Sequence, residues 1–273
     1  VALCMKVIER GTGTPRLAIV GGIHGDEPAG VRVVERLAES LAVGGTDGTV
    51  QLVTANEPAV EADERYTETD LNRTFPGDVT SDTYESALAA RLVEVLAGAD
   101  AVLALHTSHS APPPFAIYSQ LTDSVRRTVT GLPVEYAVDS SDLRGATLDS
   151  VVPHTVSLEA GRQGSDEAAE FGYEAARSFL CAHGVKTDEE PTFTEVKVAK
   201  GHEEVPKGGG EPHVYYSNFE EIQKGEVFAR DDTHTHRVDE EGVVPILASE
   251  HGYEEIFGIY GSFRESIDPP ATE

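Results

Sequence analysis

The chain is poor in sulfur-containing residues and has no tryptophan. Its 273 residues include two cysteines and one methionine. Two cysteines cannot form a disulfide framework or a four-cysteine zinc site, which excludes the small domains that depend on either. No apolar run reaches about 18 residues, so the sequence predicts no membrane-spanning helix. The first residues lead directly into charged positions instead of an apolar signal segment, and we therefore expect a soluble, cytoplasmic protein.

Basic residues are also scarce. The chain has 21 lysines and arginines against 48 aspartates and glutamates, a formal net charge of −27. This excess argues against nucleic acids and anionic membranes as partners. Hydrophobic residues make up 39% of the chain and fall in periodic segments, so we expect a folded protein. The acid is spread along the whole chain and lysine is rare, which indicates a halophilic surface whose self-repulsion is screened by molar salt; an ordinary acidic protein is the alternative. Homo-oligomerisation is left open.

Short apolar runs alternate with amphipathic helices in the first two thirds of the chain. Apolar runs at 17–23, 50–55, 101–105, 115–118 and 152–158 predict buried strands. Helices are expected from Pro28, from Ser81 and from Ser165, the last one closed by Gly184. This order predicts an α/β fold with a mostly parallel sheet that is flanked by helices.

The pattern changes after Gly184. A polar break is followed by short β-like runs at 192–198, 213–217, 226–229 and 243–247, separated by turn-rich stretches. We therefore divide the chain into an α/β domain at 1–186 and a smaller β-rich C-terminal domain at 187–265. The remaining residues, 266–273, are expected to be a disordered tail.

Residues suited to a metal site follow two of the predicted strands. His24 and Glu27 lie three residues apart at the first strand-to-helix turn, and His106 follows a later strand. In an open α/β sheet, ligands bind beyond the carboxyl ends of the strands. Two histidines and one glutamate, with a fourth position for water, are a typical catalytic zinc set. The sequence therefore predicts one Zn²⁺ per chain at this edge.

Further charged residues are expected near the same edge. Glu159 directly follows an apolar strand, where partial desolvation would raise its pKa and suit it to proton transfer; a solvent-facing carboxylate is the alternative. Arg65, Arg73 and Arg162 come from loops on this side. They either bind a carboxylate or polarise a carbonyl of an anionic small molecule, or they form surface ion pairs.

The order of the motifs resembles the succinylglutamate desuccinylase/aspartoacylase family, relatives of the zinc carboxypeptidases. The matching segments are His-Gly-Asp-Glu-Pro at 24–28, Arg-Tyr at 65–66, Asp-Leu-Asn-Arg at 70–73, Leu-His-Thr at 105–107 and Leu-Glu-Ala-Gly at 158–161. The resemblance implies a zinc-carboxypeptidase-like mixed sheet. It also implies that His24, Glu27 and His106 are the zinc ligands.

The same resemblance implies roles for other residues. Glu159 would be the base that activates water, and Arg65 would hold the scissile carbonyl oxygen. Asn72 and Arg73 would bind the carboxylate of the substrate. Tyr253, in a C-terminal stretch that is similar to a substrate-binding segment of aspartoacylases, would contact substrate or else pack in the C-terminal domain.

These residues predict a zinc-dependent amidohydrolase that acts on an N-acyl amino acid or a similar small anionic amide. A carboxypeptidase acting on peptides and a non-catalytic metal- or carboxylate-binding module are the alternatives. Neither the acyl group nor the amino acid is predicted. Of the remaining histidines, His109 is a candidate for the pocket wall, while His234 and His236 are expected to be exposed in a polar loop rather than to bind a second ion.

Overall fold

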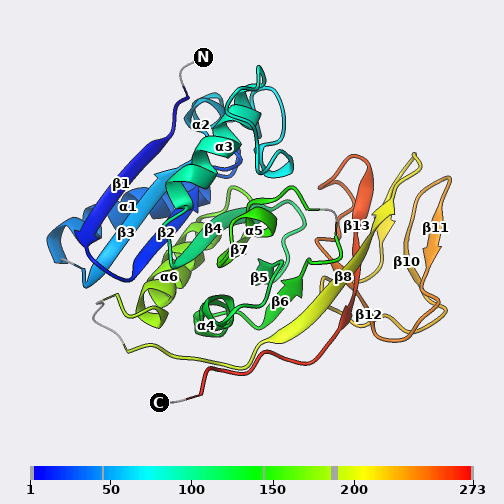
Figure 1. Cartoon of the computed structure of the whole chain (residues 1–273). Helices are drawn as coiled ribbons and strands as arrows, with labels where there is room; N and C mark the ends of the chain where they lie inside the picture. Colours follow the sequence, from blue (N-terminus) through cyan, green and yellow to red (C-terminus); the bar gives the residue numbers. More distant parts are fainter. Residues whose placement is uncertain (1–2, 45, 144, 186–189, 272–273) are drawn as a thin grey trace.

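The computed structural model describes residues 3–44, 46–143, 145–185 and 190–271. In this part of the chain strands and helices alternate up to residue 182, and strands follow (Figure 1). The helices are α1 (Pro28–Gly44), α2 (Glu57–Ala62), the 3-10 turn η1 (Leu71–Arg73), α3 (Tyr84–Leu96), α4 (Asp123–Gly131), α5 (Leu148–Val151) and α6 (Asp166–Ala182). The strands are β1 (Lys6–Thr12), β2 (Arg16–Gly21), β3 (Gly48–Thr54), β4 (Ala101–Ser108), β5 (Phe115–Tyr118), β6 (Tyr136–Asp139), β7 (Thr155–Arg162), β8 (Lys197–Pro206), β9 (His213–Val214), β10 (Val227–Arg230), β11 (Thr235–Arg237), β12 (Val243–Ile246) and β13 (Ile256–Phe263).

Ten strands form one mixed sheet in the order β1-β3-β2-β4-β7-β5-β6-β8-β13-β12. Its centre is parallel, because β3, β2, β4 and β7 run in one direction. Strand β5 is antiparallel to β7, and β1 is antiparallel to β3 at the edge. The expected mostly parallel α/β sheet is therefore confirmed, and its parallel centre brings the carboxyl ends of β2, β4 and β7 together.

Side chains that alternate along the central strands supply a core on each face of the sheet. In β2, Leu17 and Ile19 pack with buried residues of α1, α4 and α6 on one face. Ala18 and Val20 pack on the other face, with buried residues of α3 and α5. Because the side chains of a strand point alternately to its two faces, an uninterrupted apolar run is what a sheet covered by helices on both sides requires.

A close approach of backbone to backbone sets the first strand-to-helix turn. A Cβ added at Gly21 would lie 2.4 Å from the backbone carbon of Gly30 in α1. Gly22 then adopts a left-handed φ of 67°, which a residue without a side chain adopts at no steric cost. These two glycines let the chain turn directly from β2 toward the start of α1, and so place His24 and Glu27 at the sheet edge.

The C-terminal segment contributes to two sheets. Strands β8, β13 and β12 continue the main sheet from β6, whereas β9, β10 and β11 form a small antiparallel sheet (Figure 1). Phe228 of β10 in the small sheet is buried in one apolar cluster with Val205 of β8 and Phe257 of β13, so this cluster joins the small sheet to the main sheet. The β-rich character expected here is confirmed, while the division into domains at 186 and 187, which lie outside the described residues, stays a prediction. Within the predicted tail, Ile267 is buried and pairs with Val196, so regular contacts extend to this residue.

The sequence did not predict eight of the elements: β1, α2, η1, α4, α5, β6, β11 and β13. The strand expected at 192–198 is β8, Lys197–Pro206, and one helix was expected to start two residues early. Helix α3 begins after Thr83, while the Ser81 hydroxyl accepts a hydrogen bond from the Thr83 amide. None of the helices within the described residues combines the length and apolarity that a bilayer crossing requires.

Candidate active site

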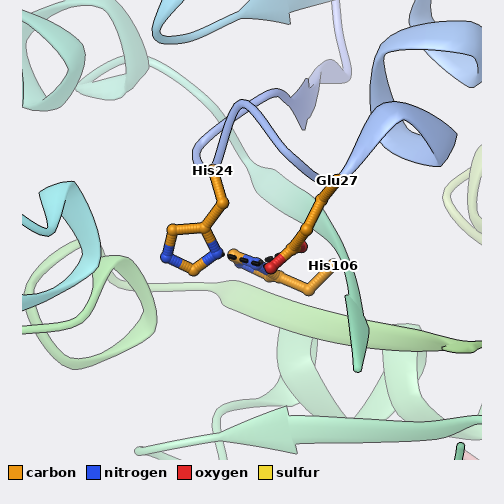
Figure 2. Close-up of side chains that lie close together, drawn as sticks. All are labelled: His24, Glu27 and His106. Atoms are coloured by element: carbon orange, nitrogen blue, oxygen red, sulfur yellow. Dashed lines mark hydrogen bonds and ion pairs between the residues drawn. The ribbon is translucent and has the colours of Figure 1, made fainter. Parts of the chain in front are cut away.

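His24, Glu27 and His106 meet at the carboxyl edge of the parallel strands (Figure 2). The first two lie in the turn between β2 and α1, and His106 lies near the end of β4. All three side chains are buried, with 3–4% of their surface exposed. One ligand atom from each lies within 4.8 Å of the other two, and no other such group of histidine, cysteine and carboxylate side chains occurs in the part of the chain that the structure describes.

The two imidazoles present the same nitrogen to the carboxylate between them. His24 Nδ1 lies 2.6 Å from Glu27 Oε1, and His106 Nδ1 lies 3.3 Å from Glu27 Oε2. The Thr107 amide also donates to Glu27 Oε2, at 2.9 Å. Two Nδ1 atoms and one carboxylate facing a common point are a donor set that Zn²⁺ accepts, with room for a non-protein ligand. The residues present therefore fit a metal ion.

The charges in this group hold each other in place. Burial alone would lower the pKa of His24, but the Glu27 carboxylate and hydrogen bonds to Asp70 and Glu27 raise it to about 9. Burial alone would raise the pKa of Glu27, yet the charge of His24 and hydrogen bonds from His106 and His24 hold it far below its usual value. Without a metal, a proton on His24 is thus the counter-charge of Glu27, and a bound cation would have to replace it.

Asp70 contacts His24 on the side away from Glu27, and the sequence did not predict this contact. Its Oδ1 lies 3.2 Å from His24 Nε2, and its Oδ2 accepts from Arg65 Nε at 3.0 Å. Burial would raise the pKa of Asp70, but a hydrogen bond from His24 and the nearby charges lower it. A carboxylate that is hydrogen-bonded to the second nitrogen of a metal-binding imidazole fixes the orientation of the ring. In the sequence, this role is indicated only by the position of Asp70, two residues before Asn72.

Glu159 lies on β7 directly beside His106, because these two residues are register partners in the β4–β7 ladder. Its Oε2 is buried and has no hydrogen-bond partner among the described residues. Burial raises the pKa of Glu159 to about 7, and the Glu27 charge adds to this while the His106 charge opposes it. Of the two alternatives left open for Glu159, the structure therefore favours the desolvated carboxylate at the site.

Arg65 lies between the carboxylates of the site. Its Nη1 is 3.6 Å from Glu27 Oε1 and its Nη2 is 3.0 Å from Asp70 Oδ2, while 37% of its side chain stays exposed. All three nitrogens of the guanidinium thus contact carboxylates, while part of the side chain still reaches solvent. This placement leaves donors for a substrate oxygen.

Asn72 and Arg73 follow Asp70 in η1. Asn72 Oδ1 accepts from the Leu148 amide at 3.0 Å, which ties the turn to α5. Arg73 is exposed, and its Nη1 donates to the Asn72 carbonyl at 2.9 Å. Its charge also lowers the pKa of Asp70, which places the guanidinium close to the site. Their expected contact with a substrate carboxylate stays a prediction.

Tyr253 reaches the same site from the segment between β12 and β13. Burial raises its pKa to about 12; the Glu159 charge adds to this, and a hydrogen bond with Ser108 opposes it. Its carbonyl accepts a hydrogen bond from Lys207, as does the Glu250 carbonyl. The phenol therefore lies among the residues expected at the site, although it is far from them in the sequence.

The other sequence candidates lie at the margin or elsewhere. Arg162 is exposed at the end of β7, opposite Ser108 in the ladder. His109 is exposed and packs against Gly252, close to Tyr253. His234 is exposed as expected, whereas His236 is half-buried in β11, where its Nε2 lies 2.7 Å from the Pro206 carbonyl. They are not among the residues that could form a metal site within the described part of the chain.

The raised pKa of Glu159 predicts a stability effect in metal-free protein. The pKa of about 7 in the folded protein lies above the ordinary value of 4.5. Ionisation of Glu159 therefore lowers the free energy of unfolding as the pH rises from about 4.5 to about 7. In chelator-treated protein, Glu159→Gln should raise the free energy of unfolding by on the order of 3 kcal/mol above pH 7 and leave it unchanged below about pH 4. Denaturant unfolding across pH measures this, with the exposed Glu174→Gln as control. An equal effect of Glu159→Gln at pH 4 and pH 8 would contradict the desolvated state.

The chain is similar to known amide hydrolases. The catalytic-domain model of the succinylglutamate desuccinylase/aspartoacylase family matches residues 13–179. An N-alpha-acetyl-L-2,4-diaminobutyric acid deacetylase from Halomonas elongata is 36% identical over 112 residues, which cover 39% of this chain and 32% of that protein. An N-acyl-aromatic-L-amino acid amidohydrolase from Danio rerio is 31% identical over 172 residues, covering 54% of this chain and 52% of that protein. The matches thus span less than two thirds of either relative.

The fold is shared over nearly the whole chain. A crystal structure of a succinylglutamate desuccinylase/aspartoacylase from Rhodobacter sphaeroides aligns with a TM-score of 0.74 at 22% identity, covering 96% of this chain and 88% of that one. The family model spans more than half of the chain and includes His24, Glu27, His106 and Glu159. The chain therefore belongs to the succinylglutamate desuccinylase/aspartoacylase family.

Proposed function

We propose that this protein is a zinc-dependent deacylase that hydrolyses the amide bond of an N-acyl amino acid. The observation that carries the proposal is the buried, unpartnered Oε2 of Glu159 beside the His24–Glu27–His106 group. A structural carboxylate at this depth would be expected to have hydrogen-bond donors. One that faces a metal-binding group without them is suited to exchange protons with a reacting molecule.

Each residue of the site has a part in the proposed reaction. Zn²⁺, held by His24, Glu27 and His106, would polarise the amide carbonyl and lower the pKa of water. Glu159 takes the proton of the attacking water on its carboxylate and returns it to the leaving nitrogen. Arg65 donates to the carbonyl oxygen as negative charge develops there.

The arginine-rich side of the site accounts for an anionic substrate. Asn72 and Arg73 are proposed to bind the carboxylate of the amino acid, and Tyr253 to contact the substrate from the C-terminal segment. Arg162, exposed at the end of β7, would bind a more distant anionic group. In a strongly acidic protein, we expect the three arginines Arg65, Arg73 and Arg162 to be the groups that attract an anion. We also propose that the protein is cytoplasmic and that its substrate is a small molecule.

Zinc binding tests the ligand set. Wild-type apoprotein should bind one Zn²⁺ per chain with release of about one proton near pH 7, since His24 is protonated in the metal-free site. His106→Ala should abolish stoichiometric binding, and Asp70→Asn should weaken it roughly 10–100-fold because the imidazole loses its orienting partner. Calorimetry in buffers of different ionisation enthalpy gives affinity and proton release together. The control is His109→Ala, which should bind as wild type; full zinc content in His106→Ala would remove this residue from the set.

Amine release from N-acetyl, N-succinyl and N-aroyl amino acids tests the reaction. Glu159→Gln should lower kcat by roughly 10²–10⁴-fold while zinc stays bound, because the glutamine cannot accept the proton. Turnover of one panel member by wild type, absent in this variant, identifies the substrate class. Turnover of C-terminal peptide bonds instead would make the protein a carboxypeptidase. Binding without turnover of any compound would make it a binding module.

We also propose that the acidic surface is adapted to molar salt. At 1 M salt the Debye length is about 3 Å, and at 0.01 M it is about 30 Å, so dilution exposes a net charge of −27 to its own repulsion. Dialysis from molar KCl into dilute buffer should therefore unfold the protein, which circular dichroism measures. A protein that stays folded in dilute buffer would refute the adaptation.

A further inference from the structure

Glu85, in the first turn of α3, is a fully buried carboxylate outside the expected site. It accepts hydrogen bonds from three consecutive backbone amides of the preceding loop: Thr67 at 2.7 Å, Glu68 at 3.2 Å and Thr69 at 3.2 Å. The Thr67 hydroxyl donates as well, at 2.7 Å. Burial would raise the pKa of Glu85, but these bonds hold it below its usual value. The carboxylate is thus an anion with a nearly complete shell of donors.

The contact is reciprocal and reaches a third element. Glu68 Oε2 accepts from the Tyr84 amide at 2.7 Å, so the loop also satisfies an otherwise free amide at the start of α3. Asn56 Nδ2 donates to Glu85 Oε1 at 3.2 Å, while Asn56 Oδ1 caps α2. One buried carboxylate therefore joins the loop, α2 and α3. Three consecutive amides that point at one carboxylate leave the loop little freedom to change its backbone conformation.

This loop carries the residues that flank the metal-binding group. Arg65 lies two residues before the fixed amides, and Asp70 lies one residue after them. Asp70 contacts His24 Nε2, and Arg65 contacts both Asp70 and Glu27. The Arg65 carbonyl additionally accepts from the Gly25 amide at 3.3 Å. Displacing the fixed amides would move Arg65 and Asp70 together.

We propose that Glu85 is a positioning residue of the site, which holds the 65–70 loop so that Asp70 orients His24 and Arg65 faces the substrate carbonyl. This inference rests on the proposed function for its effect on turnover, but not for its effect on the loop or on zinc. A merely structural role would lower the stability of the fold and leave the geometry of the site intact. Distinguishing the two requires a comparison at equal loss of stability.

The test compares Glu85→Gln with Val129→Ala. Glutamine keeps the size of the side chain but replaces one acceptor by an amide donor among several amide donors, so the loop should detach. Val129 is fully buried in α4, in the apolar cluster on the other face of the sheet. Truncating it to alanine should therefore lower the stability of the fold and leave the 65–70 loop unchanged. Both variants are assayed well below their melting temperatures. We expect Glu85→Gln to lower kcat/KM more than roughly tenfold and to weaken zinc binding as Asp70→Asn does, while Val129→Ala changes neither.

Hydrogen exchange of the 67–69 amides gives a readout that needs no substrate. These amides should be protected in the wild type and in Val129→Ala, and exchange faster in Glu85→Gln. Wild-type protection and zinc affinity in Glu85→Gln would overturn the proposal even if the protein is an active deacylase. If Glu85→Gln loses this protection and binds zinc more weakly, but the wild type hydrolyses no panel member, the positioning role is upheld and only the proposed function is contradicted.

A double-mutant cycle locates the effect on turnover. At a zinc concentration that saturates every variant, so that the effect through Asp70 on zinc affinity is removed, Glu85→Gln should cost at most a few-fold in kcat/KM once Arg65→Ala has removed the group being positioned. A purely structural residue would cost the same factor in both backgrounds, since its effect would not depend on Arg65. Equal costs in the two backgrounds would therefore overturn the role in turnover.

Discussion

The arrangement of the site depends on one buried negative charge, the carboxylate of Glu27. A carboxylate that is 3% exposed must be paired and hydrogen-bonded, since an unpaired charge at that depth would cost several kcal/mol. Its partners come from separate parts of the chain: His24 from its own turn, and His106 with the Thr107 amide from β4. Satisfying this one group requires β2 and β4 to be neighbours in a parallel sheet, which is the arrangement at the centre of the fold.

A second buried carboxylate, Glu85, fixes the 65–70 loop in the way that Glu27 fixes the two histidines. Each accepts both side-chain and backbone donors, and each joins elements that are distant in sequence. The two are connected through Arg65 and Asp70, whose side chains contact the Glu27–His24 pair while the residues between them contact Glu85. The site is therefore built on two anchored segments rather than on a flexible loop, as precise positioning of reacting groups requires.

The residues that the strand pattern predicted lie at the ends of recognisable strands, whereas Arg65, Asn72, Arg73 and Tyr253 were predicted from loop position or from the family resemblance. His24, Glu27, His106 and Glu159 each follow an apolar run, and parallel strands bring such ends together. The Asp-Leu-Asn-Arg segment placed Asp70 near the site, but its contact with His24, 46 residues away, could not be read from the sequence. Glu85 was missed because its partners lie 16–18 residues away and no local pattern records them. Strand β13 was missed because Gly258 and Gly261 interrupt its apolar run; both are needed where a side chain would strike neighbouring backbone. The exposed strand β1 has no apolar alternation to detect.

The charges of the site nearly balance in the metal-free protein, and they would also nearly balance with a divalent cation bound. Glu27, Asp70 and Glu159 supply three carboxylates, and Arg65 supplies one fixed positive charge. In metal-free protein, a proton on His24 and a raised pKa at Glu159 reduce the excess of negative charge. A divalent cation in place of the His24 proton offsets two of those carboxylates, so Glu159 can be ionised without leaving the site strongly negative. In metal-free protein the pKa of about 7 lets Glu159 change its charge within a buried site, and the proposed role as a base rests on its position beside His106 and on its unpartnered Oε2.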